Sequence, residues 1–128
     1  MKAVAMDSGL TFSSSNEIAC IEFKSGRLDI TTQSTDGNQS VRVIFSEIAG
    51  FRVLDEGDLL EFWPTCSSAK DWIFQITEGG WFDQECLRSG FVRGDIKEIN
   101  EYLISGINEC VSVFSWAPPE LKAVTRDK

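Results

Sequence analysis

The stretch that decides the fold is residues 17–33, EIACIEFKSGRLDITTQ, in which two β-type runs flank a short turn. The first run, Glu17–Phe23, ends at Lys24-Ser25-Gly26, where the glycine allows a positive φ. The second run, Arg27–Gln33, alternates between an apolar and a polar face. The apolar face is formed by Leu28, Ile30 and Thr32. Two such runs joined by so short a link predict an antiparallel β-hairpin.

The same pattern continues along most of the chain. Further short strands are predicted at residues 40–45, 51–54, 59–63, 72–77, 81–87 and 107–116. In the first of these, alternation predicts inward-facing side chains at Val41, Val43 and Phe45. Polar or glycine-containing turns at 34–39, 55–58 and 78–80 separate neighbouring strands, and Pro64 is expected to end one of them. Links this short require antiparallel neighbours.

One helix is predicted between the last two strands. Asp95 is a suitable N-cap, Glu98 has the spacing of a capping box, and Gly106 provides a stop. The apolar stripe of this helix is formed by Ile96, Ile99, Tyr102 and Leu103. The expected fold is therefore α+β, an antiparallel meander of seven or eight short strands, curved or barrel-like, with this helix packed against it.

The 128 residues are expected to form a single domain, 1–128. Residues 1–16 read as a loosely ordered lead-in or a poorly formed first strand, and residues 120–128 as a frayed tail. The N-terminus has too short an apolar run for a signal peptide, and no window is long enough for a membrane span. The four cysteines are therefore expected to be free thiols in a reducing cytoplasm.

Composition excludes several kinds of function. The chain has no histidine, which removes Ser-His-Asp and Cys-His catalysis and most zinc sites. Its net charge of −8 disfavours nucleic acids and anionic membranes as partners and suits a basic one. No metal, cofactor or catalytic residue is predicted, and the protein is expected not to be an enzyme.

Carboxylates are concentrated at residues 55–61, DEGDLLE. Asp55, Glu56 and Asp58 fall in a predicted turn, and strand alternation points Glu61 outward. Such groups lack the desolvation that an acid/base pair needs. The spacing also lacks the ligands of a calcium loop. The favoured interpretation is an exposed acidic surface.

A second acidic segment surrounds Gly79-Gly80, where no Lys or Ser/Thr follows to complete a phosphate-binding loop. If residues 81–87 form a strand, Trp81, Asp83 and Glu85 share one face. Two interpretations stay open for Trp81, an anchor in a protein interface or a residue that closes the end of a barrel.

Several stretches together resemble the small immunity proteins of bacterial contact-dependent growth inhibition and related polymorphic toxin systems. These stretches are FRVLDEGDLL at 51–60, Gly79-Gly80-Trp81 followed by Glu85, EYLI at 101–104, NECVSV at 108–113 and Pro118-Pro119. The resemblance covers about residues 40–120. It implies a cytoplasmic, non-enzymatic antitoxin that binds the C-terminal toxin domain of its own system and blocks it.

The leading expectation is an immunity protein that binds a basic toxin domain, possibly a nuclease, without nucleic acid or membrane. Its predicted partner-binding residues are Asp55, Glu56, Asp58, Glu61, Glu78, Trp81, Asp83 and Glu85. The alternatives are a non-enzymatic intracellular module that binds a peptide or lipid headgroup, and a carboxylate-dependent hydrolase.

Overall fold

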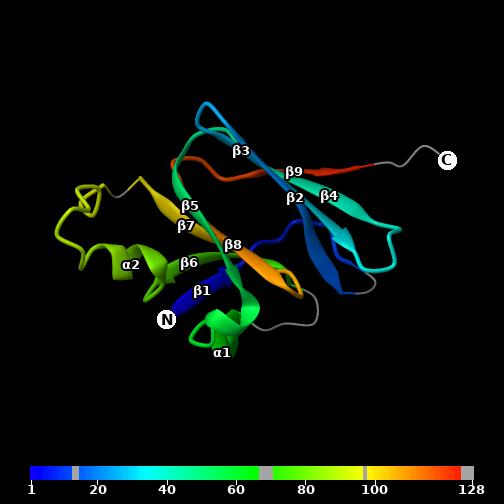
Figure 1. The fold of residues 1–128 in the computed structure, drawn as a ribbon, viewed down its shortest axis with the longest axis horizontal. Coiled ribbons are helices and arrows are strands. Elements are labelled where there is room, and N and C mark those ends of the chain that lie inside the picture. The colour runs from blue at the N-terminus through cyan, green and yellow to red at the C-terminus, as the bar shows by residue number, and fades with distance from the viewer. Residues whose placement is uncertain (13–14, 67–70, 97, 125–128) are drawn as a thin grey trace.

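A computed structural model describes residues 1–12, 15–66, 71–96 and 98–124. Two antiparallel sheets dominate these residues (Figure 1). Sheet A has the strand order β1 (Lys2–Ala5), β6 (Ile73–Glu78), β7 (Asn100–Ile104), β8 (Glu109–Ser115) and β5 (Ile48–Asp55). Sheet B has the order β2 (Asn16–Lys24), β3 (Arg27–Ser34), β4 (Ser40–Phe45) and β9 (Glu120–Ala123). The helices are short: η1 (Glu56–Asp58), α1 (Trp63–Cys66) and α2 (Trp81–Glu85).

The predicted hairpin at residues 17–33 is confirmed. Strands β2 and β3 pair in antiparallel register, and Lys24 faces Arg27 across the turn. Ser25 and Gly26 both have positive φ, 51° and 81°, which is the geometry of a two-residue hairpin turn that follows the strand twist. The predicted apolar face of β3 is fully buried.

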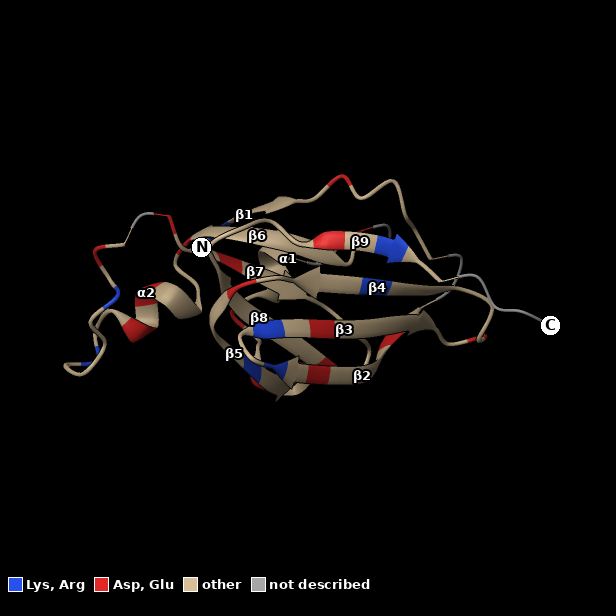
Figure 2. Ribbon diagram, turned by 90° about the horizontal axis from the view of Figure 1, so that it is seen from above, with Lys and Arg blue, Asp and Glu red and all other residues tan. Residues whose placement is uncertain are grey.

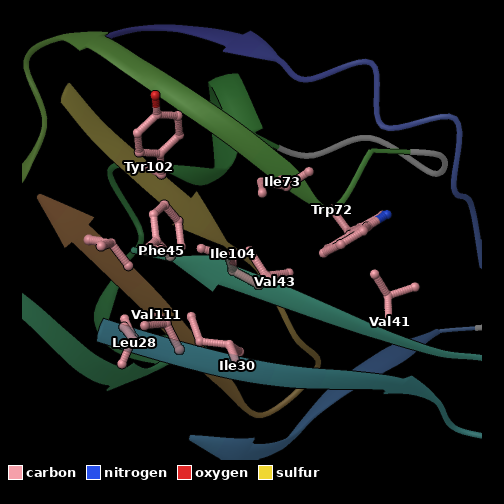
Figure 3. Packing of buried hydrophobic residues seen from close by; sticks show 11 residues of the cluster. Leu28, Ile30, Val41, Val43, Phe45, Trp72, Ile73, Tyr102, Ile104 and Val111 are labelled. Carbon is pink, nitrogen blue, oxygen red and sulfur yellow. The ribbon is translucent and has the colours of Figure 1, made fainter. Parts of the chain in front are cut away.

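The main core lies between the two sheets (Figure 3). From β3 and β4 it receives Leu28, Ile30, Val41, Val43 and Phe45. From sheet A and the residue before β6 it receives Trp72, Ile73, Tyr102, Ile104, Val111 and Val113. The predicted inward residues of β4 are therefore confirmed. The Trp72 indole N–H donates to the Leu10 carbonyl oxygen at 2.9 Å, which satisfies the polar atom of this ring.

The strand predicted at residues 59–63 is wrong. After β5 the chain forms η1, a turn and α1, and Pro64 lies inside α1 instead of ending a strand. β5 pairs with β8, from Ile48 opposite Ser115 to Asp55 opposite Glu109, at the edge of sheet A. The physical reason for the difference is burial, because the chain after β5 packs its apolar side chains onto the face of sheet A instead of extending the edge. Leu59, Phe62 and Cys66 follow a helical spacing instead and are buried against sheet A.

In two further segments, the structure has a helix where a strand was predicted and a strand where a helix was predicted. Residues 81–85 form α2 instead of a strand, and the predicted helix over 95–106 contains strand β7. Strand β7 lies between β6 and β8, so Tyr102 and Ile104 face sheet B while Glu101 and Leu103 face the other side. All four side chains are buried, and a run buried on both faces lacks the alternation that marks a strand.

Both termini contribute strands. The expected lead-in contains β1, which pairs with β6 at the edge of sheet A. The tail predicted to be frayed contains β9, which pairs with β4 from Ile44 opposite Glu120 to Val41 opposite Ala123. Residues 125–128 of that tail lie outside the described residues. Within the described ranges, no helix has the length and hydrophobicity needed to cross a bilayer.

Candidate protein-binding surface

The outer face of sheet A, which points away from sheet B, is covered by two connections. Residues 56–72 join β5 to β6, and residues 79–99 join β6 to β7. The first connection buries Leu59, Phe62 and Cys66 in a second apolar cluster. Their partners on sheet A are Phe74, Ile76, Leu103 and Cys110. This packing fixes the position of the acidic segment, which begins at the end of β5.

Hydrogen bonds hold the backbone of the acidic segment in place. The Gly57 N–H donates to Asp55 Oδ1 at 2.7 Å, which caps η1. The Glu56 N–H donates to the Asn108 carbonyl oxygen at 2.9 Å. The Trp63 indole N–H donates to the Glu56 carbonyl oxygen, also at 2.9 Å. The segment is therefore anchored to the residue before β8 and to α1, although it does not lead directly into a strand.

The side chains of this segment point into solvent. Asp55, Glu56, Asp58 and Glu61 are exposed, and none of them belongs to an ion pair formed between described residues. Leu60, in their midst, is 71% exposed. We call these five residues the acidic ridge. The ridge combines unpaired negative charge with an apolar contact point, a combination that suits a basic protein surface.

Trp81 is the first residue of α2 and is partly buried. Its ring stacks on Phe114 of β8, with ring centroids 4.0 Å apart. The Arg52 guanidinium lies 4.9 Å from the centroid of the Trp81 ring. The indole N–H donates to Glu85 Oε1 at 3.1 Å, one helical turn on. The ring thus has three internal partners and attaches α2 to sheet A.

The other predicted residues of this segment have internal partners as well. Glu85 accepts from Arg88 Nε at 2.8 Å, and this bond, followed by that from Trp81, lowers the pKa of the Glu85 carboxyl. Asp83 is exposed and accepts from the Gly79 N–H at 2.6 Å. Glu78 is exposed and pairs with Lys2 at 3.3 Å. Apart from Asp83, the predicted carboxylates that form no ion pair between described residues are therefore those of the ridge.

Glu101 of β7 is a buried carboxylate that the sequence reasoning missed, because it lay in the predicted helix. Its side chain is 3% exposed and accepts from the Trp81 N–H at 3.0 Å and from the Phe82 N–H at 2.6 Å. Burial raises the pKa of its carboxyl, and these two N–H groups and Arg52 partly oppose that rise. The signal available in the sequence was a single acid, Glu101, at the start of the otherwise apolar stretch 101–104.

Arg52 of β5 is the second missed residue, and its guanidinium lies beside Trp81 of α2. Its Nε and Nη2 atoms are buried and find no hydrogen-bond acceptor within the described part of the chain. Burial lowers the pKa of this guanidinium, while the negative charges of Glu101, Glu61 and Glu85 oppose that change. Glu61 of the ridge and Glu85 of α2 thus act on one cation.

A cavity of about 320 Å³ opens between the end of β6 and the start of α2. Glu101, Asp83 and Glu78 line it together with Phe82 and Ile99. Both oxygens of Glu101 already accept backbone N–H groups that hold α2, which indicates a structural role for this carboxylate. Among the described residues, no group of three or more Cys, Asp or Glu side chains is placed to bind a metal ion.

Comparisons with known proteins give no independent assignment: no protein-family model, curated protein or solved structure matches the chain. The feature with the clearest chemical meaning is the acidic ridge, on a chain whose net charge is −8.

Proposed function

We propose that the protein is a cytoplasmic immunity protein that binds and neutralises a basic bacterial toxin domain in a stoichiometric complex. The observation that supports this most directly is the acidic ridge. Its four carboxylates are exposed and form no ion pair between described residues, around an exposed Leu60, on a backbone held by buried Leu59 and Phe62.

Electrostatics favours such a complex both before and after contact. A field of one sign raises the rate at which an oppositely charged partner is encountered, and it disfavours partners of the same sign. Neutralising a toxin calls for nanomolar affinity or better, which corresponds to about 12 kcal/mol or more. Leu60 and the partly buried Trp63 supply apolar surface beside the carboxylates.

The ridge also contains a local conflict that binding would relieve. Asp55 on β5 lies directly opposite Glu109 on β8, and like charges in that position destabilise a sheet. A sequence selected for stability alone has a simple remedy, a lysine at one of the two positions. Local violations of this kind are expected at functional sites. A basic side chain from the partner, placed between these carboxylates, removes the repulsion.

The alternative of a module for a peptide or lipid headgroup has less support. A headgroup site calls for a cluster of basic residues, and Lys24 and Arg27 are the close basic pair of the first hairpin. Arg27 lies 3.9 Å from Asp29, so part of its charge is already compensated.

The test is co-expression with the toxic domain that is encoded immediately upstream. We expect the cells to survive and the two chains to co-elute as a stable complex in gel filtration. Cell death, together with separate elution of the two purified chains, contradicts the proposal. A chain that is unfolded by circular dichroism is excluded from the comparison, so that the result reports on binding.

A further inference from the structure

The loop that follows α2, residues 86–94, projects away from both sheets (Figures 1 and 2). It contains Leu87, which is 88% exposed, and Val92, which is 85% exposed. These are the two largest exposures among the large hydrophobic residues of the described chain. The loop also contains Arg88 and Arg93 and no Asp or Glu, although the whole chain has a net charge of −8. We call residues 86–94 the tip.

Internal contacts give the tip a fixed shape. The Phe91 ring meets Phe82 at 5.6 Å and Phe114 at 6.1 Å between centroids, so it points back to sheet A. The Arg88 guanidinium lies 5.9 Å from the Phe91 ring centroid. The Phe91 N–H donates to the Arg88 carbonyl oxygen at 3.1 Å, and this bond closes the turn between them. With Phe91 turned inward, its sequence neighbour Val92 is left in solvent.

The two arginines of the tip keep part of their charge available. Arg88 pairs with Glu85 at 2.8 Å but its side chain remains 61% exposed. Arg93 lies 5.3 Å from the centroid of the Trp116 ring and forms no ion pair with a described carboxylate. The tip therefore presents two exposed aliphatic side chains, each followed in the sequence by an arginine, while the ridge presents carboxylates.

We propose that the tip inserts Leu87 and Val92 into an apolar pocket of the toxin domain, and that carboxylates at the mouth of this pocket pair with Arg88 and Arg93. This inference rests on the proposed function and assigns a second contact to the same partner. Charge complementarity selects the pocket, because the cations of the tip oppose the sign of the ridge. The fixed shape of the tip lowers the entropic cost of insertion.

Two contacts of opposite sign also determine how the partner docks. A basic region of the toxin faces the ridge, and an acidic-rimmed pocket faces the tip. A rotated complex would place like charges together at both contacts, which disfavours it. An anionic membrane is the less suitable occupant, since the net charge of −8 opposes the approach of the chain to such a surface.

The test compares the dissociation constant of the toxin complex for the wild-type chain and for the double variant Leu87→Ser/Val92→Ser. Both positions are exposed, so the variant is expected to keep the thermal unfolding profile of the wild type. We expect affinity to fall roughly 10- to 100-fold, mainly through faster dissociation. Val4→Ser is the matched control, because Val4 is a 59% exposed aliphatic residue on β1, and it is expected to leave affinity unchanged.

The outcomes separate the two proposals. If the wild-type chain binds the toxin domain and the double variant binds it with the same affinity, the tip inference is overturned and the proposed function stands. If the wild-type chain does not bind the toxin domain at all, both proposals fail. Sedimentation of the wild type, but not the double variant, with vesicles of phosphatidylcholine and phosphatidylserine would assign the tip to a membrane and overturn the inference.

Discussion

The inner face of sheet A packs aliphatic and aromatic side chains against β3 and β4, whereas its outer face carries both an apolar cluster and the charged side chains Arg52 and Glu101 beneath two irregular connections. The inner face forms by regular alternation of strands. The outer face is covered by segments with helices of only three to five residues. The ridge and the tip both belong to these covering segments. In this contrast, the two sheets provide a stable frame, and the two connections that cover sheet A carry the proposed binding surfaces.

The largest effect is expected from removing a ring on either face. Phe45 on the inner face and Phe62 on the outer face are both 0% exposed, so Phe45→Ala and Phe62→Ala should each lower the free energy of unfolding by about 3–5 kcal/mol. Urea unfolding measures both. If Phe62→Ala alone lowered the free energy of unfolding by less than about 1 kcal/mol, the first connection would detach easily from sheet A. The ridge could then not be a rigid surface.

A smaller effect is expected at Gly80, which precedes α2. A Cβ atom there would lie 2.5 Å from Ile76 Cγ2 and 2.7 Å from Glu101 Oε2, and both side chains are buried. Gly80→Ala should therefore cost about 1–3 kcal/mol. Gly50→Ala is the control, because its Cβ would meet Phe114 at an ordinary 3.7 Å. Equal stabilities of the two variants in urea unfolding would contradict the close packing of α2 on Glu101.

The pH dependence of stability tests the buried carboxylate. Because burial raises the pKa of Glu101, the folded chain holds this proton more tightly than the unfolded chain. Stability therefore falls as the pH rises from the ordinary value of 4.5 through the raised pKa, and the loss is complete above it. Arg52 and Asp83 are the charged groups that act on it.

The variant Glu101→Gln has no proton to bind at this position. The wild type should therefore gain stability relative to this variant as the pH is lowered from 7 toward 4.5. Urea unfolding of both proteins across this range gives the difference. A difference that is independent of pH would show that Glu101 is solvated, and that the start of α2 is open.

The smallest effect is expected in thiol labelling, which reports on opening of the first connection. Cys20 and Cys86 are exposed, whereas Cys66 and Cys110 are buried in the apolar cluster between the first connection and sheet A. Burial raises the pKa of the Cys66 thiol to about 11. Iodoacetamide should label Cys20 first, and Cys66 and Cys110 only after local opening. Labelling of all four at one rate in the folded protein would mean that the outer face is not closed.

The inner face could be predicted from sequence because period-2 alternation survives wherever one face of a strand is buried and the other is not. Strand β3 shows this, with Leu28, Ile30 and Thr32 buried and Asp29 partly exposed. Strand β7 could not be predicted in the same way. It is buried on both faces, and the spacing of Ile96, Ile99 and Leu103 coincides with that of a helix.

The candidate site was predictable in part for a similar reason. Exposure of the carboxylates at 55–61 follows from their density in a polar turn, even though the turn leads to α1 and not to a strand. The environment of Trp81 depends on Phe114 and Arg52, which are distant in sequence. Helices α1 and α2 are also too short for a periodic pattern to reveal them.

The association rate of the toxin domain with the ridge variant Glu56→Lys/Asp58→Lys is the most direct test that the ridge binds it, because this variant leaves the Asp55 cap of η1 in place. Its control is Asp7→Lys/Glu47→Lys, which makes the same change of net charge at exposed positions outside the ridge. Stopped-flow mixing at low ionic strength measures both, after urea unfolding has verified that each variant is within about 0.5 kcal/mol of the wild type. We expect the ridge variant to associate roughly tenfold more slowly or worse, and the control to change much less. Equal association rates of the ridge variant and the wild type at low salt would contradict the claim that the acidic ridge receives the basic partner.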